Sequence, residues 1–195
     1  MPNWCQNTLN VSGDKNDIRM FKAKARGHTH SYHAFTRNRE WPLHDDIRLK
    51  AKLSTIPELG EVVDLSFHSL YPVPDDFLRF PYDDRQAVEL GEKIGEDRPY
   101  GGYRWESIHW GCKWGSCDSE LFVEEDCFLQ YEFSTPWGPP NEFLQRVSED
   151  WPNLSFELEY SESGMGFAGK IGFQNGDCFM EETWDYEEDY EEGEE

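Results

Sequence analysis

The sequence predicts an α+β fold in which an antiparallel sheet carries helices on one face. Several segments alternate between apolar and polar residues, as half-buried strands do, and segments with apolar residues at helical spacing lie between them. The chain also contains 8 Trp, 9 Tyr and 13 Phe residues, and each such side chain can bury a large area. We therefore expect one globular domain covering about residues 1–180 of the 195-residue chain.

The first elements of the predicted domain are a strand and a helix. Residues Thr8–Val11 alternate and form the strand. Asp14 then stands at a position suited to a helix N-cap, and Ile18, Met20 and Phe21 follow on or near one face of the helix.

An insertion is predicted at about residues 27–100, because the regular periodicity is lost there. Its first part is basic and rich in His, with a short helix expected over Asp45–Leu53. Farther along, Val62–Leu70 alternates like a strand, and a second helical stretch runs through Arg85–Ile94.

The second half of the chain is predicted to be mostly strand. A tight turn at Glu125-Asp126 joins two of the strands. Pro139 and Pro140 precede the helix, where proline is tolerated because the first N–H groups of a helix lack partners. The predicted strands are Tyr103–Trp110, Leu121–Glu125, Cys127–Ser134, Leu154–Tyr160 and Phe167–Phe173, and the helix is Asn141–Glu149.

The C-terminal segment, Glu181–Glu195, has the composition of an acidic tail. It contains ten acidic residues and no basic one. Such runs usually stay solvated, but Trp184, Tyr186 and Tyr190 are interleaved in it and indicate a docking segment with aromatic anchors. The acidic residues predicted to contact a partner are Glu181, Glu182, Asp185, Glu187, Glu188, Asp189, Glu191 and Glu192.

The charge balance limits the classes of partner. With 18 basic and 40 acidic residues, the formal net charge is −22. Direct binding to nucleic acid and to anionic membranes needs clustered Lys and Arg, so both are disfavoured. An acidic surface instead attracts basic proteins, including those that themselves bind nucleic acid. The alternative is that the acidity only keeps the chain soluble.

The sequence also predicts a cytoplasmic location. The N-terminus has neither the basic nor the apolar region of a signal peptide, and no apolar run approaches the ~20 residues of a membrane helix. The five cysteines form no CxxC pair and are odd in number. That pattern indicates reduced thiols, some of them in the core.

A GxGxxG motif is formed by Gly164, Gly166 and Gly169. A dinucleotide site needs a helix after this loop, whereas Lys170–Phe173 alternates like a strand. Nearby carboxylates would also repel phosphate. We therefore interpret the motif as a hairpin loop, and no cofactor is predicted.

Two further patterns suggest chemistry. The first is a group of weak candidates for metal ligands, His28, His30 and His33. The competing interpretation is a surface loop whose His side chains titrate near neutral pH. Cys112 lies beside Lys113 and could be an activated nucleophile, but packing beside Trp residues is the favoured interpretation. No catalytic signature is present, so we expect no enzyme.

Four short blocks carry a resemblance to a known family. They read MPNWCQN, WGCKW, TPWGPP and, after Tyr160, GMGFAG. In this order they resemble the YubB ferredoxin-like domain family of phage and plasmid proteins. In the last three blocks the residues that carry the resemblance are Trp110, Gly111, Lys113, Trp114, Trp137, Pro139, Pro140, Gly164, Gly166 and Gly169.

The resemblance implies a ferredoxin-like α+β topology, an origin in mobile genetic elements and no established activity. The name does not imply an iron–sulfur cluster, since the cysteine spacing for one is absent. His109 and Cys112 depart from the family pattern, in which Asn and Thr are usual beside Trp110. Trp110, Trp114 and Trp137 are expected to pack in the core, and the alternative is that they line a groove.

Together these observations predict an interaction protein that binds and inhibits or modulates a basic host protein. A defence nuclease or another DNA-binding protein fits, since an array of carboxylates can imitate DNA. One alternative is a metal-dependent enzyme or metal-binding module built on the His-rich insertion. The other is a structural mobile-element protein whose acidity only confers solubility.

Overall fold

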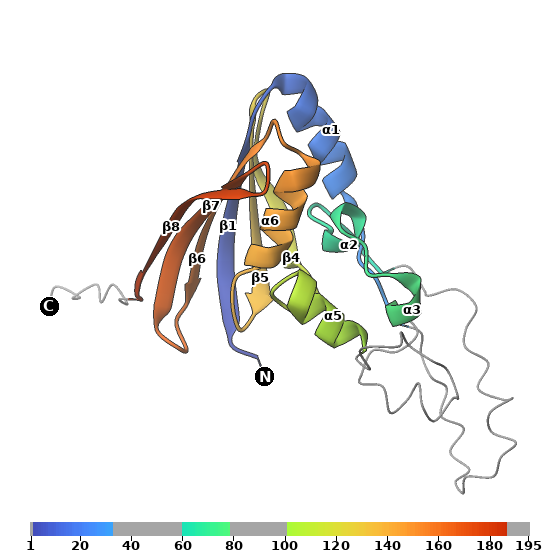
Figure 1. Ribbon diagram of the computed structural model, residues 1–195, viewed down its shortest axis with the longest axis vertical. Helices are drawn as coiled ribbons and strands as arrows, with labels where there is room; N and C mark the ends of the chain where they lie inside the picture. Colours follow the sequence, from blue (N-terminus) through green and yellow to red (C-terminus); the bar gives the residue numbers. More distant parts are fainter. Residues whose placement is uncertain (1, 33–59, 79–100, 187–195) are drawn as a thin grey trace, which may run out of the picture.

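The fold is centred on a six-stranded antiparallel sheet with the strand order β4-β5-β1-β6-β7-β8 (Figure 1). A computed structural model describes residues 2–32, 60–78 and 101–186. The strands of the sheet are β1 (Trp4–Ser12), β4 (Cys117–Glu125), β5 (Phe128–Pro136), β6 (Ser155–Glu162), β7 (Phe167–Gln174) and β8 (Asp177–Asp185). The helices are α1 (Lys15–Ala25), α2 (Phe67–Leu70), α3 (Asp75–Leu78), α5 (Gly102–His109) and α6 (Asn141–Asp150).

Strand alternation divides the sheet into a core face and an open face. In β1, Cys5, Leu9 and Val11 are buried, whereas Gln6 and Ser12 are exposed. Helices α1 and α6 lie against the core face (Figure 1) and bury the apolar side of each helix there. The order β1-α1-β4-β5-α6-β6 is the ferredoxin-like arrangement, so the predicted fold class is confirmed.

Aromatic side chains fill much of the core. The Phe67 and Phe143 rings stack with their centroids 3.7 Å apart. Phe21 of α1 makes edge contacts with Tyr131 of β5 and Phe156 of β6, at centroid distances of 6.4 and 5.4 Å. Such edge geometry is favourable for aromatic pairs, and it links the helix to two strands on either side of β1.

The described part of the predicted insertion lies beside α1. Strands β2 (Gly27–His28) and β3 (Val62–Val63) form a short antiparallel pair. The predicted strand Val62–Leu70 is confirmed only for Val62–Val63. Its later residues form α2, because the Ser66 hydroxyl accepts the Ser69 N–H at 3.1 Å and caps the start of a helix. The predicted helices Asp45–Leu53 and Arg85–Ile94 lie outside the described residues.

The predicted strand Tyr103–Trp110 is wrong, because this segment forms α5. Its buried residues are Gly102, Trp105 and Glu106, which share one face of a helix. One of these buried residues, Glu106, is charged, which the polarity pattern of the sequence did not indicate. None of the described helices has the length and apolar character to cross a membrane.

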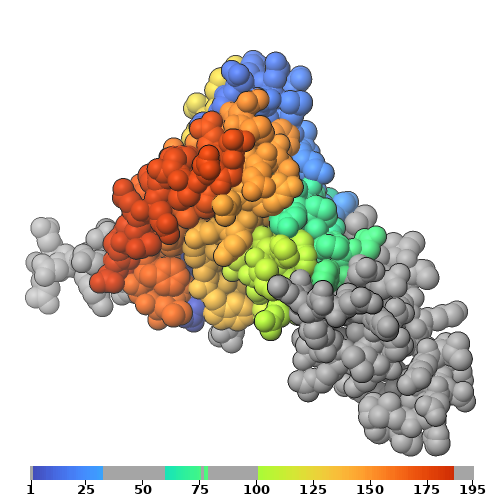
Figure 2. All heavy atoms as spheres, viewed as in Figure 1, coloured from blue at the N-terminus to red at the C-terminus, as the bar shows by residue number. Residues whose placement is uncertain are grey.

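The C-terminal strands extend the sheet beyond β6. Asn175 and Gly176 both have positive φ, 51° and 82°, and form the two-residue turn between β7 and β8. The predicted boundary at residue 181 therefore falls inside β8, and the first residues of the predicted acidic tail belong to the sheet. In the space-filling view (Figure 2) this hairpin forms one margin of the molecule, next to α6.

We predict that Gly169→Ala destabilises the protein by roughly 1–3 kcal/mol. A Cβ at Gly169 would lie 2.5 Å from Cζ of Tyr160 and 2.6 Å from the backbone oxygen of Glu182, so β7 and β8 must shift. Urea denaturation measures the change. Gly138→Ala is the matched control, because a Cβ there meets nothing within 4 Å. Equal stability of the two variants would contradict the close packing of Gly169 against Tyr160 and Glu182.

Candidate functional site

The open face of the sheet presents side chains in rows that cross the strands. We call one of them the acidic row, because four of its six positions are glutamates. Neighbouring members are directly opposite one another in the strand register. From β4 to β8 the acidic row is Glu120, Glu132, Thr8, Glu159, Lys170 and Glu182.

The acidic row places like charges side by side. Glu120 of β4 is directly opposite Glu132 of β5, an arrangement that destabilises a sheet. The basic residue of the row, Lys170, forms an ion pair with Glu159, which raises the pKa of the Lys170 ammonium. Glu157 adds a further exposed carboxylate on the same face of β6.

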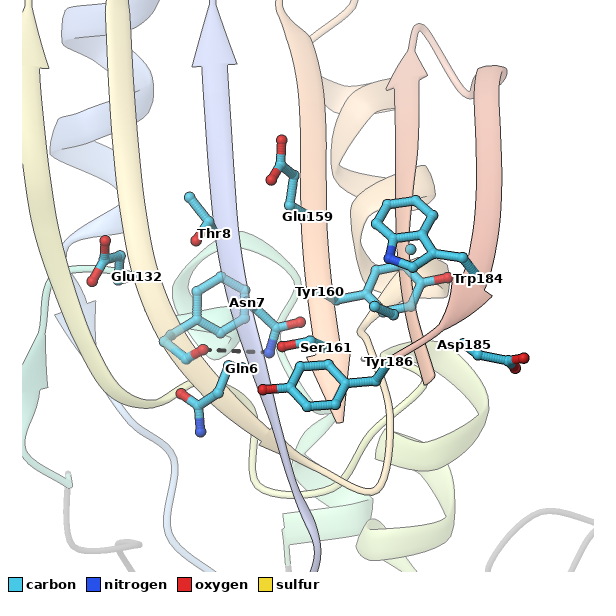
Figure 3. A pocket seen from close by; sticks show the side chains of 13 residues that line it. Gln6, Asn7, Thr8, Glu132, Glu159, Tyr160, Ser161, Trp184, Asp185 and Tyr186 are labelled. Carbon is cyan, nitrogen blue, oxygen red and sulfur yellow. Dashed lines mark hydrogen bonds between the residues drawn. The ribbon is translucent and has the colours of Figure 1, made fainter. Parts of the chain in front are cut away.

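A groove of about 810 Å³ lies along this face and reaches β8 (Figure 3). Its walls combine carboxylates, small polar side chains and aromatic rings. Figure 3 shows the Trp184 ring at the β8 side of the groove and the Tyr186 ring pointing from the end of β8 towards Ser161. The lining residues are Gln6, Asn7, Thr8, Glu132, Phe133, Glu159, Tyr160, Ser161, Ala168, Gly169, Trp184, Asp185 and Tyr186.

None of the described residues that line the groove is basic. Glu132, Glu159 and Asp185 contribute negative charge from three different strands. Flat aromatic faces beside carboxylates are suited to cationic side chains, which gain from both the charge and the ring. The site can therefore accommodate a basic ligand.

The predicted tail residues are divided between this site and the rest of the chain. Glu182 and Trp184 lie on the open face, opposite Lys170 and Ala168. Glu181 pairs with the buried Ile171, so by alternation it points to the other face. Asp185 and Tyr186 line the groove. The predicted partner-contacting residues Glu187, Glu188, Asp189, Glu191 and Glu192, and the anchor Tyr190, lie outside the described residues.

The residues of the WGCKW and TPWGPP blocks do not share one environment. Trp110 is fully buried and its indole N–H donates to the Tyr71 carbonyl at 3.0 Å, as expected for a core residue. Trp114 and Trp137 are exposed, so the expectation that they pack in the core is wrong. Their rings are 5.7 Å apart, and Lys113 places its ammonium 5.5 Å from the centre of the Trp137 ring.

The remaining members of these blocks shape the chain around the tryptophans. Gly111 has a φ of +78°, and a Cβ there would meet the Glu142 carboxylate of α6, so the position favours glycine. Pro139 and Pro140 directly precede α6, as predicted.

The GxGxxG segment is the loop between β6 and β7. The buried carboxylate of Glu162 accepts the N–H groups of Gly164 at 2.7 Å and Met165 at 2.6 Å. A strand and not a helix follows the loop, since Gly169 is already within β7. The hairpin interpretation is confirmed, and these N–H groups are already used by the carboxylate.

The two metal candidates that lie in the described residues, His28 and His30, contact different groups. His28 contacts the Gly60 carbonyl through Nδ1 at 2.8 Å, whereas His30 contacts the Glu106 carboxylate. His33 lies outside the described residues. Among the residues that the structure describes, no group of three or more His, Cys, Asp or Glu side chains is arranged to hold a metal ion.

The sequence analysis missed a buried carboxylate network. Glu106 of α5 is completely buried, and within the described part of the chain its carboxylate accepts three hydrogen bonds. His30 donates through Nε2 at 2.5 Å, the Trp114 N–H donates at 2.8 Å, and the Tyr32 hydroxyl is the third donor. Burial and the neighbouring carboxylate of Glu106 raise the pKa of Tyr32, so that hydroxyl keeps its proton. Three donors compensate for the loss of water around the carboxylate.

The thiol of Cys112 is not an activated nucleophile. Burial, followed by the charge of Glu106, raises the pKa of Cys112 well above its usual value. Burial likewise raises the pKa of Cys5 to about 12. Both thiols are protonated core residues, as the packing interpretation predicts.

Two comparisons with known proteins agree with this architecture. A family model described as "Ferredoxin-like domain in Api92-like protein" matches residues 109–195. The fold is ferredoxin-like. A crystal structure of a protein api92 from Yersinia pseudotuberculosis is similar over 96% of this chain and 99% of that chain, with a TM-score of 0.60 and 11% sequence identity. Among curated proteins no sequence matches this chain.

These comparisons refine the predicted resemblance. Its ferredoxin-like part is confirmed, while the matching description refers to Api92-like proteins and not to YubB. At 11% identity the structural likeness concerns the fold alone. The function must therefore be argued from the surface of this chain.

We predict that the unfolding free energy falls as the pH is lowered from about 6.5 to about 4, with His68 as one cause. Burial, followed by the charge of His30, lowers the pKa of His68 from 6.5 to about 4. Its Nδ1 accepts the Val73 N–H at 3.1 Å, so the ring is neutral in the fold. Between these pH values the unfolded chain binds a proton at His68 that the folded protein does not, which favours unfolding.

His68→Gln is expected to reduce this pH dependence. Urea denaturation at steps from pH 7 to pH 4 compares the variant with the native protein. Asp75 and Glu106 favour the protonated ring and Lys24 opposes it, so their charges should be left unchanged. Parallel stability curves for the two proteins would show that His68 titrates normally in the fold.

We also predict that Glu106→Gln lowers the unfolding free energy by roughly 1–3 kcal/mol, because an amide cannot accept all three hydrogen bonds. Tryptophan fluorescence during urea denaturation measures the loss. Glu125→Gln, an exposed change of the same chemistry in β4, should stay within about 0.5 kcal/mol of the native protein. A native-like Glu106→Gln variant would mean that the network contributes no net stability.

Proposed function

We propose that this protein is an acidic interaction protein that binds a basic, nucleic-acid-binding protein with the open face of its sheet and thereby inhibits or modulates it. The observation that carries this proposal is the acidic row. Glu120 and Glu132 are held opposite each other, although sheet stability alone favours opposite charges at such a pair. A local cost of this kind is typical of residues retained for function.

The spacing of the carboxylates supports a partner that normally binds nucleic acid. Glu132 and Glu159 stand on the two strands that flank β1, so they are about 10 Å apart, which is two strand spacings. Glu157 and Glu159 are about 7 Å apart along β6. A rigid sheet thus holds negative charges in two directions, as a phosphate array does, and a cationic nucleic-acid channel is complementary to it.

The aromatic rings of the groove offer apolar contacts in addition to the attraction between charges. Trp184 is about half exposed on the open face, and Tyr186 lines the same groove. Large aromatic residues serve as anchors in protein interfaces because they bury much area at little entropic cost. The acidic row would attract a basic surface, and these rings would hold it.

The proposal also includes the origin of the protein and the place where it acts. The resemblance of the four sequence blocks to the YubB family favours a protein of phage or plasmid origin that acts in the host cytoplasm. A host nuclease or another defence protein that binds DNA is then the kind of target that fits. The acidic residues after Tyr186 would add to the attraction, since they are part of the same charged segment.

The experiment is capture of partners on the immobilised full chain from a nuclease-treated bacterial lysate. We expect a basic protein to bind at about 0.05 M salt, to be lost at about 0.5 M salt, and to be displaced by duplex DNA. A variant with Glu132→Gln, Glu157→Gln and Glu182→Gln should lose at least tenfold in affinity for that protein, measured by calorimetry.

The matched control carries Asp14→Asn, Glu142→Gln and Glu149→Gln. It loses the same charge, but these residues lie at α1 and α6, which cover the core face. Equal loss of binding in both triple variants would show that net charge, and not the open face, matters. Absence of any partner that duplex DNA displaces would favour the view that the acidity only confers solubility.

A further inference from the structure

Three tryptophans form a continuous aromatic surface at one end of the sheet, which we call the tryptophan shelf. Trp4, Trp114 and Trp137 come from β1 and from two loops, with ring centroids 6.3 Å apart for Trp4 and Trp114 and 5.7 Å apart for Trp114 and Trp137. They are 40%, 39% and 46% exposed. Each ring therefore offers a large apolar area to a ligand.

Two of the three residues have an unusual backbone conformation. Trp114 and Trp137 have φ values of +70° and +67°, which are rare for bulky side chains and cost energy. The Trp114 N–H donates to the buried Glu106 carboxylate at 2.8 Å, and the Trp137 N–H donates to the Asn3 carbonyl at 2.8 Å. The fold thus fixes these two rings at the surface at an energetic cost.

The shelf already faces one cation. The ammonium of Lys113 lies 5.5 Å from the centre of the Trp137 ring, within the range of a cation–π interaction. The shelf also adjoins the acidic row, because Trp4 belongs to the same face of β1 as Gln6 and Thr8. A basic side chain that is attracted by the acidic row therefore lies next to exposed aromatic rings.

We propose that the tryptophan shelf binds the guanidinium group of an arginine side chain from the basic partner, and that Lys113 is an internal competitor for it. This inference rests on the proposed function, since it names the side chain by which the partner is recognised. A guanidinium is planar and weakly hydrated, and it stacks on aromatic faces while still donating hydrogen bonds to carboxylates. An ammonium is compact and strongly hydrated, so it gains less from the shelf.

The test compares an octa-arginine peptide with an octa-lysine peptide, which carry equal charge. Calorimetry with the full chain should give a several-fold higher affinity for the arginine peptide. Trp4→Leu should lower the affinity for the arginine peptide by about threefold, as expected for one exposed cation–π contact, and should affect the lysine peptide less. Glu132→Gln should lower both affinities by the same factor.

Lys113→Gln provides a second measurement on the same site. The substitution removes one positive charge, which should strengthen binding of both peptides. It also removes the competing ammonium from the Trp137 ring, which should strengthen binding of the arginine peptide further. This extra gain should disappear when Trp137→Leu is also present, because the contested ring is then absent. Circular dichroism and thermal unfolding confirm that each variant is folded.

The possible results separate the two proposals. If both peptides bind equally and the Trp variants behave like the native protein, the shelf does not recognise arginine, while binding of basic ligands by the acidic row remains supported. If neither peptide binds at low salt, the acidic face attracts no basic ligand and both proposals are overturned. Arginine selectivity that Trp4→Leu removes supports the shelf.

Discussion

Strand β1 is paired on both sides, and its alternation determines what each face of the molecule contains. The buried residues Cys5, Leu9 and Val11 meet the helices, while Gln6 and Thr8 lie on the open face. Because β5 and β6 are in register with β1 on either side, their residues alternate between the core face and the open face in the same way. One pattern therefore builds an aromatic core on one side and places carboxylates in rows on the other.

Alternation was enough to predict most of the sheet, and the errors have identifiable causes. Glu106 is a charged residue in a core position, so the burial pattern of α5 could not be recognised from polarity. The side-chain cap at Ser66 ended an apparent strand. Strand β8 was missed because its acidic composition resembles a solvated tail, although the Asn175-Gly176 turn is a recognised hairpin signal.

The candidate site was less predictable than the fold. The excess of acidic residues was evident in the sequence, but the pairing of Glu120 with Glu132 depends on register shifts in β4 that no local pattern indicates. Exposure of Trp114 and Trp137 depends on backbone angles that bulky residues rarely adopt. Composition predicted an acidic surface, and only the three-dimensional arrangement shows which acidic and aromatic residues share one face of the sheet.

The hydrogen bonds of Glu106 also affect how the chain can evolve. Two of its three donors, His30 and Tyr32, come from the start of the insertion, whereas the third comes from Trp114. Of the donors in the described residues, a shorter protein without the insertion at about residues 27–100 would keep only the Trp114 N–H for this buried charge, which is costly. Loss of the segment must therefore be accompanied by an uncharged residue at position 106, so that insertion length and the sequence of α5 change together.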